Sequence, residues 1–193
     1  MKKIKLLSIS AMFLFAACNS TNKMTTTKEM NSSKTVMVGG AEMYPTKNIV
    51  ENAVNSKDHT TLVAAVKAAG LVETLASAGP FTVFAPTNMA FEALPAGTVE
   101  TLLQPENKSK LTTVLTYHVV AGRYSAADLM KMIKEGNGTA SLPTVQGETL
   151  SFKQNGSAIM VSDDNGGTAR VTIADVNQSN GVIHVVDKVL LPK

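Results

Sequence analysis

A chain of 193 residues suits a single domain with an appended segment, and its hydrophobic fraction of 44% is enough to build a packed core. Tryptophan is absent and aromatic residues make up 5% of the chain, which argues against binding single-stranded nucleic acid by stacking. Lys2, Lys3 and Lys5 account for the formal net charge of +3, so the remaining chain is neutral and lacks the basic block typical of nucleic-acid-binding proteins.

Residues 1–17 have the layout of a secretory signal peptide. Lysines come first, an apolar run from Leu6 to Phe15 follows, and small residues precede Cys18. The apolar run is too short for a comfortable transmembrane helix. The tetrapeptide Phe-Ala-Ala-Cys at 15–18 resembles a bacterial lipobox, although that motif prefers leucine at the first position. We therefore expect cleavage before Cys18 and lipidation of that residue; the alternative is an ordinary signal peptide followed by a chance cysteine.

Cys18 is the only cysteine of the chain. Once it carries lipid, the folded part has no thiol left for a disulfide, a catalytic thiolate or a zinc–thiolate site. The segment that follows is rich in Thr, Asn, Ser and Lys and buries too little apolar surface to order itself. We predict a lipidated cysteine and flexible tether over residues 18–44 and a folded domain over residues 45–193. Asn19, in place of the Asp of inner-membrane retention signals, favours the outer membrane with the domain facing the periplasm, and leaves exposure at the cell surface open.

The first half of the expected domain carries helix signals. The apolar spacing from Ile49 to Val54 predicts one helix, and a second helix, capped by Asp58, is expected to end at Gly70. One strand and several short helices are expected after it: helix Leu71–Ala76, strand Phe81–Ala85, turn Asn88–Leu94 capped by Thr87, helices Thr98–Leu103 and Pro105–Thr116, and helix Leu129–Glu135 behind a capping box at Ser125–Asp128.

After Gly138, strand signals replace helix signals. Four strand-like runs are separated by glycine-containing turns: Thr149–Lys153, Ala158–Val161, Ala169–Ile173 and Val182–Leu191. A helix-rich first half and a strand-rich second half predict an α+β fold. No internal repeat is visible, so the chain holds one copy of the unit.

Three segments together resemble the fasciclin domain family. Phe81-Thr-Val-Phe-Ala-Pro-Thr-Asn-Met-Ala-Phe91 is similar to the first signature of that family, Leu115-Thr-Tyr-His-Val-Val120 to its tyrosine–histidine signature, and Asn180–Pro192 to its closing signature. Their order and separation also fit, and the resemblance covers about residues 47–192. It implies an α+β, fasciclin-like wedge of two β-sheets with packed helices.

The resemblance also implies an adhesion or envelope interaction module and not an enzyme. The sequence has no nucleophile elbow and no set of transpeptidase-like motifs. Besides the membrane lipid on Cys18, we expect a protein or glycan partner of the cell envelope or extracellular matrix, and no nucleic acid, metal or cofactor. The alternative is a carrier that binds a small molecule or glycan between the helices and the sheets. A ligand-sized apolar cavity would favour the carrier, and a solid core with an exposed apolar patch would favour adhesion.

Two residue pairs are candidates for partner binding. In eukaryotic fasciclin domains the tyrosine–histidine segment is implicated in integrin binding, which maps onto Tyr117 and His118. Asp175 and Val176 take the place of an Asp-Ile pair that is linked to integrin recognition in some members. The competing interpretation is structural for both pairs: a buried ring at Tyr117, a bonded imidazole at His118, and a turn between strands at Asp175.

The remaining polar candidates are expected to be structural. His184 lies inside a strand-like run and His59 lies beside Asp58 at a helix start, and the histidines show no metal-ligand spacing. The run Asp163–Gly167 lacks the ligand pattern of a calcium-binding loop, so we interpret it as a hairpin turn.

Overall fold

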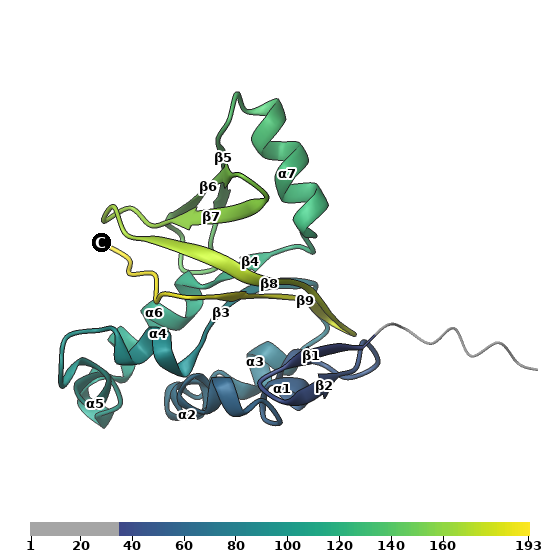
Figure 1. Cartoon of the computed structure of the whole chain (residues 1–193). Coiled ribbons are helices and arrows are strands. Elements are labelled where there is room, and N and C mark those ends of the chain that lie inside the picture. Colours follow the sequence, from purple (N-terminus) through teal and green to yellow (C-terminus); the bar gives the residue numbers. More distant parts are fainter. Residues whose placement is uncertain (1–34) are drawn as a thin grey trace, which may run out of the picture. The chain divides into compact units, whose positions relative to one another are not determined.

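The computed structural model describes residues 35–193 (Figure 1). The predicted signal peptide, Cys18 and residues 19–34 lie outside the described residues. Among the helices of the described part, none is both long and apolar enough to cross a membrane. A layer of helices, a curved sheet of seven strands and a two-stranded hairpin make up this part, so the predicted α+β fold is confirmed.

The seven strands form one sheet in the order β4-β3-β9-β8-β7-β6-β5. β8 serves both halves of this sheet, since its first residues pair with β7 and its later residues pair with β9. Register shifts between Val171 and Val176 allow β8 to bend between the two halves, which gives the wedge of two sheets. The strands are β3 (Phe81–Pro86), β4 (Val119–Ala121), β5 (Ala140–Pro143), β6 (Thr149–Asn155), β7 (Ala158–Ser162), β8 (Thr168–Gln178) and β9 (Gly181–Val186).

The two ends of this sheet meet. Val120 of β4 forms an isolated bridge with Thr144, just beyond β5. The backbone N–H of Val145 donates to the carbonyl of Val119 at 2.7 Å. The sheet therefore curls almost into a barrel, and the space that it encloses is filled by a core that includes Phe84, Phe152 and residues of β7.

The helices begin and end largely where the sequence predicts. α1 and α7 start at capping boxes of Asn48 and Ser125, α4 starts at Thr87, and α2 ends at Gly70, whose φ of 73° suits glycine. Asp58 does not cap α2: it lies in a 3₁₀ turn, and Asn88 accepts the Thr61 N–H instead, at 3.0 Å. The helices are α1 (Ile49–Ala53), η1 (Lys57–His59), α2 (Thr60–Ala69), α3 (Val72–Ala76), α4 (Asn88–Glu92), α5 (Thr98–Leu102), η2 (Pro105–Asn107), α6 (Lys108–Tyr117) and α7 (Ala126–Glu135).

An N-terminal hairpin corrects the predicted boundary at residue 44. β1 (Val36–Val38) and β2 (Ala41–Met43) pair antiparallel, although we assigned both to the flexible tether. Val38 and Met43 are buried in the same hydrophobic cluster as residues of β3 and β9. The two side chains supply the apolar surface that the Thr- and Ser-rich segment before them lacks, so residues 36–43 belong to the folded part.

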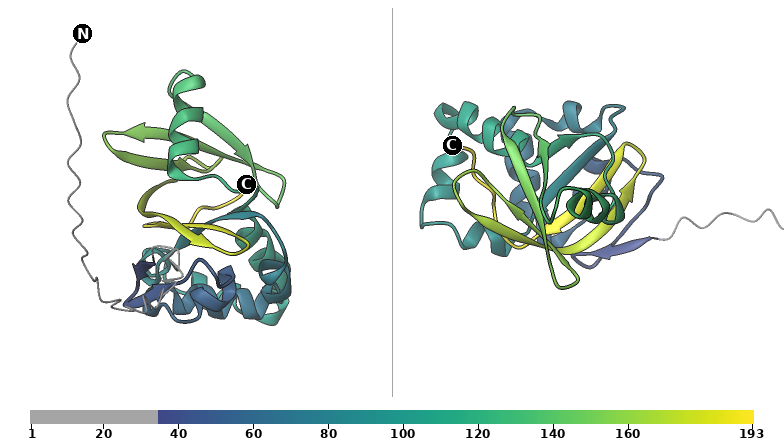
Figure 2. Two further views of the ribbon diagram at one scale, coloured as in Figure 1. Left: turned by 90° about the vertical axis from the view of Figure 1, so that its right-hand side faces the viewer. Right: turned by 90° about the horizontal axis from the view of Figure 1, so that it is seen from above.

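Two hydrophobic cores lie on opposite faces of β3 and β9. On one face, Val83, Ile183 and Val185 pack with α1, α3 and the hairpin. On the other face, Phe84 and Val186 belong to the core inside the curled sheet, which α7 covers through Leu129 and Ile133. Figures 1 and 2 show the resulting layers, with α1 to α3 on one side of β3, β8 and β9 and with α7 and β5 to β7 on the other.

Candidate functional site

The three signature-like segments meet on neighbouring strands. β3, from the first segment, pairs antiparallel with β4, which follows Tyr117 and His118. On its other edge β3 pairs parallel with β9 of the closing segment, with Phe81 opposite Gly181. Segments separated by up to about a hundred residues of sequence therefore form one continuous piece of the sheet, and the candidate residues lie in or beside it.

Tyr117 is the last residue of α6 and is fully buried. Its hydroxyl donates to the Thr149 carbonyl at 3.1 Å and accepts from the Asp164 N–H at 3.2 Å. Burial raises the pKa of this hydroxyl, so it stays protonated and able to donate. Tyr117 thus joins α6 to the start of β6 and to the turn between β7 and β8.

His118 joins three parts of the domain through its ring and its backbone. Nδ1 lies 2.8 Å from the Val114 carbonyl, and Nε2 accepts from the Leu190 N–H at 3.0 Å. Because a carbonyl can only accept, the ring carries its proton on Nδ1 and is neutral. Burial lowers the pKa of His118 to about 4. The His118 carbonyl accepts from the Phe84 N–H at 2.9 Å, so α6, β3 and the C-terminal segment all meet at this residue.

Asp175 and Val176 lie in the irregular part of β8. Val176 is buried against the hairpin and β9. Asp175 has a φ of 58°, and its carboxylate accepts from the N–H of Ala126, the first residue of α7, at 2.7 Å. Its own N–H donates to His184 Nδ1 at 3.3 Å. The carboxylate thereby fixes the start of α7 on the sheet.

His184 is a fully buried residue of β9 and is bonded through both ring nitrogens. Nε2 lies 2.8 Å from the Tyr124 carbonyl, while Nδ1 accepts from Asp175. The ring also stacks on Phe84, with ring centroids 5.6 Å apart. Burial lowers the pKa of His184. The predicted packing role of this residue matches these contacts.

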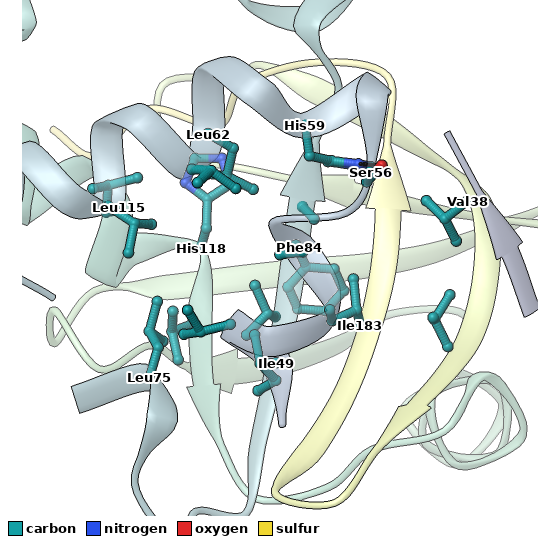
Figure 3. A pocket seen from close by; sticks show the side chains of 18 of the residues that line it. Val38, Ile49, Ser56, His59, Leu62, Leu75, Phe84, Leu115, His118 and Ile183 are labelled. Atoms are coloured by element: carbon teal, nitrogen blue, oxygen red, sulfur yellow. Dashed lines mark hydrogen bonds between the residues drawn. The ribbon is translucent and has the colours of Figure 1, made fainter. Parts of the chain in front are cut away.

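An apolar cavity of about 70 Å³ lies between the helices and the sheet (Figure 3). Residues of α1, α2 and α3 form one wall, and residues of β3, β4, β8 and β9 form the other. His118 and Val176 both line it, whereas Tyr117 and Asp175 do not. The structure therefore brings one member of each candidate pair to a common cavity.

His59 also lines this cavity, and our sequence interpretation missed it. Nδ1 lies 2.8 Å from the Ser56 hydroxyl, whereas Nε2 is buried without any hydrogen-bond partner. Burial lowers the pKa of His59, and the nearby Ala85 carbonyl opposes that shift without making a well-formed bond. Helical spacing offered a signal, because His59 precedes Leu62 and Val66 on the apolar face of α2.

The Asp163 carboxylate ties the turn between β7 and β8 to the C-terminal segment. One carboxylate oxygen accepts from the N–H groups of Asn165 and Gly167, and the other accepts from Leu191. In residues 35–193 no group of three His, Cys, Asp or Glu side chains is placed to hold a metal ion.

Comparison with known proteins gives a family match over most of the folded part. The model of the fasciclin domain matches residues 57–192. The chain is 49% identical over 161 residues to Protein sll1483 of Synechocystis sp., covering 83% of this chain and 82% of that protein. It is 39% identical over 145 residues to Immunogenic protein MPT70 of Mycobacterium tuberculosis, covering 72% of this chain and 66% of that protein.

More distant similarities extend to animal proteins. The chain is 37% identical over 131 residues to transforming growth factor-beta-induced protein ig-h3 of Sus scrofa, covering 68% of this chain but 17% of that protein. Among solved structures, a FAS1 domain pair from the insect cell adhesion molecule Fasciclin I superposes with a TM-score of 0.67 at 18% identity. That similarity covers 75% of this chain and 51% of the pair, and it supports the fold.

Proposed function

Because the chain belongs to the fasciclin domain family, we propose that it is an extracytoplasmic adhesion or envelope interaction module, held to a bacterial membrane by lipid on Cys18, and not an enzyme. The observation that carries this proposal is the family match over residues 57–192, which includes all three signature-like segments. The similar solved structure belongs to a cell adhesion molecule, and none of the reported relatives bears the name of an enzyme.

The partner is proposed to meet exposed side chains in or near the signature segments, because the candidate residues Tyr117, His118 and Val176 are themselves buried. Tyr117, His118 and Val176 are all at most 3% exposed. Their proposed contribution, with Asp175, is to hold the shape of the binding surface. Met89 of α4 is 77% exposed within the first signature segment, and Met37 of the hairpin is 56% exposed. These apolar groups are the contacts we propose first.

The proposed partner is a protein or glycan of the envelope or the extracellular matrix. The full-length protein should be cross-linked in its native envelope and recovered with both protein and glycan detection. We expect one saturable partner whose capture falls at least about tenfold for Met89→Lys, since a charge there disrupts an apolar contact. Val145→Lys, on another exposed apolar residue, is the control. Capture that is unsaturable, or that is equal for both variants, would contradict the proposed surface.

A location on the outer membrane, facing the periplasm, is proposed from Asn19 and from the lipobox-like segment. Two or more acyl chains on Cys18 would hold the protein stably, whereas a single chain would hold it only marginally. Separation of inner and outer membranes, followed by protease treatment of intact cells, tests both the membrane and the face.

The cavity favours a second role, which is the carrier alternative. A ligand held between the helices and the sheet would occupy an interior site, separate from the surface that we propose for adhesion. The two roles are compatible, since they use different residues.

A further inference from the structure

Four asparagine–glycine pairs occur in the chain, and the structure restrains one of them far less than the others. An asparagine that precedes glycine readily loses its side-chain amide, because the backbone nitrogen of glycine can reach the side-chain carbonyl carbon without hindrance from a Cβ atom. The reaction is fastest where the asparagine side chain is mobile and the glycine N–H is not held in a hydrogen bond. The pairs begin at Asn137, Asn155, Asn165 and Asn180.

Two of these asparagines are held by their side chains. The Asn180 amide accepts from the Ile49 N–H at 3.0 Å and donates to two backbone carbonyls at the end of α3, both at 2.8 Å. The Asn165 amide donates to the carbonyls of Leu191 and Pro192, also at 2.8 Å. Each side chain would have to break at least two hydrogen bonds before its carbonyl carbon could be attacked, so both sites are protected.

Asn137 is restrained in a different way, through the nitrogen that would attack it. This residue follows α7, and its exposed side chain makes no hydrogen bond to any residue that the structure describes. The N–H of Gly138, however, donates to the Ile133 carbonyl at 2.8 Å. Because the nitrogen must lose this proton before it attacks, the hydrogen bond slows the reaction at Asn137.

Asn155 has neither restraint. It is the last residue of β6 and pairs with Ala158 across a two-residue turn, Gly156-Ser157, in which Gly156 has a φ of 59°. Asn155 and the turn are exposed, and within residues 35–193 neither the Asn155 amide nor the Gly156 N–H makes a hydrogen bond. The pair nearest the turn is also the end of the hairpin, where strands open most readily.

We propose that Asn155 is a site of spontaneous deamidation, which converts this asparagine into a mixture of aspartate and isoaspartate. Opening of the pair with Ala158 lets the chain rotate until the deprotonated Gly156 nitrogen attacks Cγ of Asn155. A C–N bond forms, the bond between Cγ and Nδ2 breaks, and the side-chain nitrogen leaves as ammonia. Water then opens the resulting succinimide ring at either of its carbonyls. The turn gains a negative charge, and the isoaspartate form also adds a methylene group to the backbone.

The test follows all four asparagines in one sample of the full-length protein. The protein is kept at mildly alkaline pH in water enriched in heavy oxygen, which labels each new carboxylate, and every site is quantified by peptide mass spectrometry. We expect Asn155 to react about three- to tenfold faster than Asn137, since the hydrogen bond of the Gly138 N–H is the main difference between them. Asn165 and Asn180 should react more than about tenfold more slowly than Asn155. In urea all four should react at similar rates, because each precedes glycine.

Two variants check the assignment. Asn155→Gln should remove most of the ammonia release from the folded protein, because the longer side chain forms the corresponding larger ring much more slowly. Asn137→Gly, which suits the φ of 54° at that position, should leave the rate at Asn155 unchanged. Another of the four asparagines that reacts as fast as Asn155 in the folded protein would overturn the proposal. Ammonia release from Asn155→Gln at the rate of the parent would overturn it as well.

Discussion

His118 makes the stability of the domain depend on pH. The pKa of its imidazole is about 4 in the folded protein against 6.5 for a free histidine. Between these values the unfolded chain takes up a proton that the folded domain does not bind. The contribution of His118 to the free energy of unfolding is therefore complete above pH 6.5 and is lost as the pH falls towards 4. This contribution is on the order of 3 kcal/mol. His59 and His184, whose pKa values are also lowered, act in the same direction.

Urea unfolding between pH 7 and pH 4 measures this effect. We expect the free energy of unfolding to fall across that window, and we expect a shallower fall in His118→Asn. The variant should also be less stable at pH 7 by about 1–3 kcal/mol, because the Leu190 N–H loses its acceptor. A parent protein whose stability does not change between pH 7 and pH 4 would show that the buried imidazole takes up its proton without unfolding.

The buried hydroxyl of Tyr117, and not only its ring, should contribute to the stability of the domain. Tyr117→Phe leaves the Thr149 carbonyl and the Asp164 N–H without their shared partner. We expect a loss of about 1–3 kcal/mol in unfolding free energy. Tyr44→Phe is the matched control, because the Tyr44 hydroxyl bonds Glu42 at the exposed surface and its removal should leave the melting temperature close to that of the parent. Equal melting temperatures of the two variants would contradict the internal role of Tyr117.

The sequence predicted the burial of some residues but not all of their hydrogen-bond partners. The helical spacing of Val114 and His118 indicates that the histidine faces the interior, and the ring bonds the Val114 carbonyl. The partner at Leu190 could not be predicted, because it depends on where the C-terminal segment returns to the sheet. The unpaired Nε2 of His59 could not be predicted for a similar reason: its burial depends on how α1, α2 and the sheet pack together.

The N-terminal hairpin should contribute measurably to the stability of the domain. Met43→Ala removes a buried side chain from the cluster that the hairpin shares with β9, and we expect a loss of about 2–4 kcal/mol. Met37→Ala is the control within the same hairpin, because Met37 is exposed and its removal should change stability by about 0.5 kcal/mol or less. If both variants melt like the parent, the hairpin does not pack on the domain in solution.

Helices and strands with strong local sequence signals were predicted, whereas very short strands were missed. α7 and β6 carry strong local signals, namely a capping box and apolar alternation, and both appear close to the expected bounds. The hairpin and β5 (Ala140–Pro143) were missed because strands of three or four residues hold too few alternations to be recognised. Asp58 was wrongly expected to cap α2, since Asn88, thirty residues later in sequence, takes that place.

The parallel pairing of β3 with β9 could not be predicted from the local sequence pattern. The helix-rich first half and strand-rich second half predicted the α+β class, and the fasciclin resemblance implied the wedge of two sheets. The periodicity of residues 81–85 and 182–186 indicated only buried strands and not that they pair with each other. A hydrophobic core lies on each face of these two neighbouring strands, so almost every residue of both strands is buried. The resemblance did not indicate the cavity, because its wall combines side chains from helices, hairpin and sheet.

Anchoring of an adhesion module through Cys18 is tested most directly by a paired measurement on Cys18→Ala and the parent protein. The two are compared for partition into detergent, for thermal melting and for capture of the identified partner by the isolated membrane fraction. We expect Cys18→Ala to leave the detergent phase, to melt at the same temperature as the parent and to leave the membrane fraction unable to capture the partner, because a folded domain without lipid is no longer held at the membrane. A Cys18→Ala protein that stays with the membrane after a high-salt wash, or a membrane fraction that captures the partner as before, would contradict the proposed anchor.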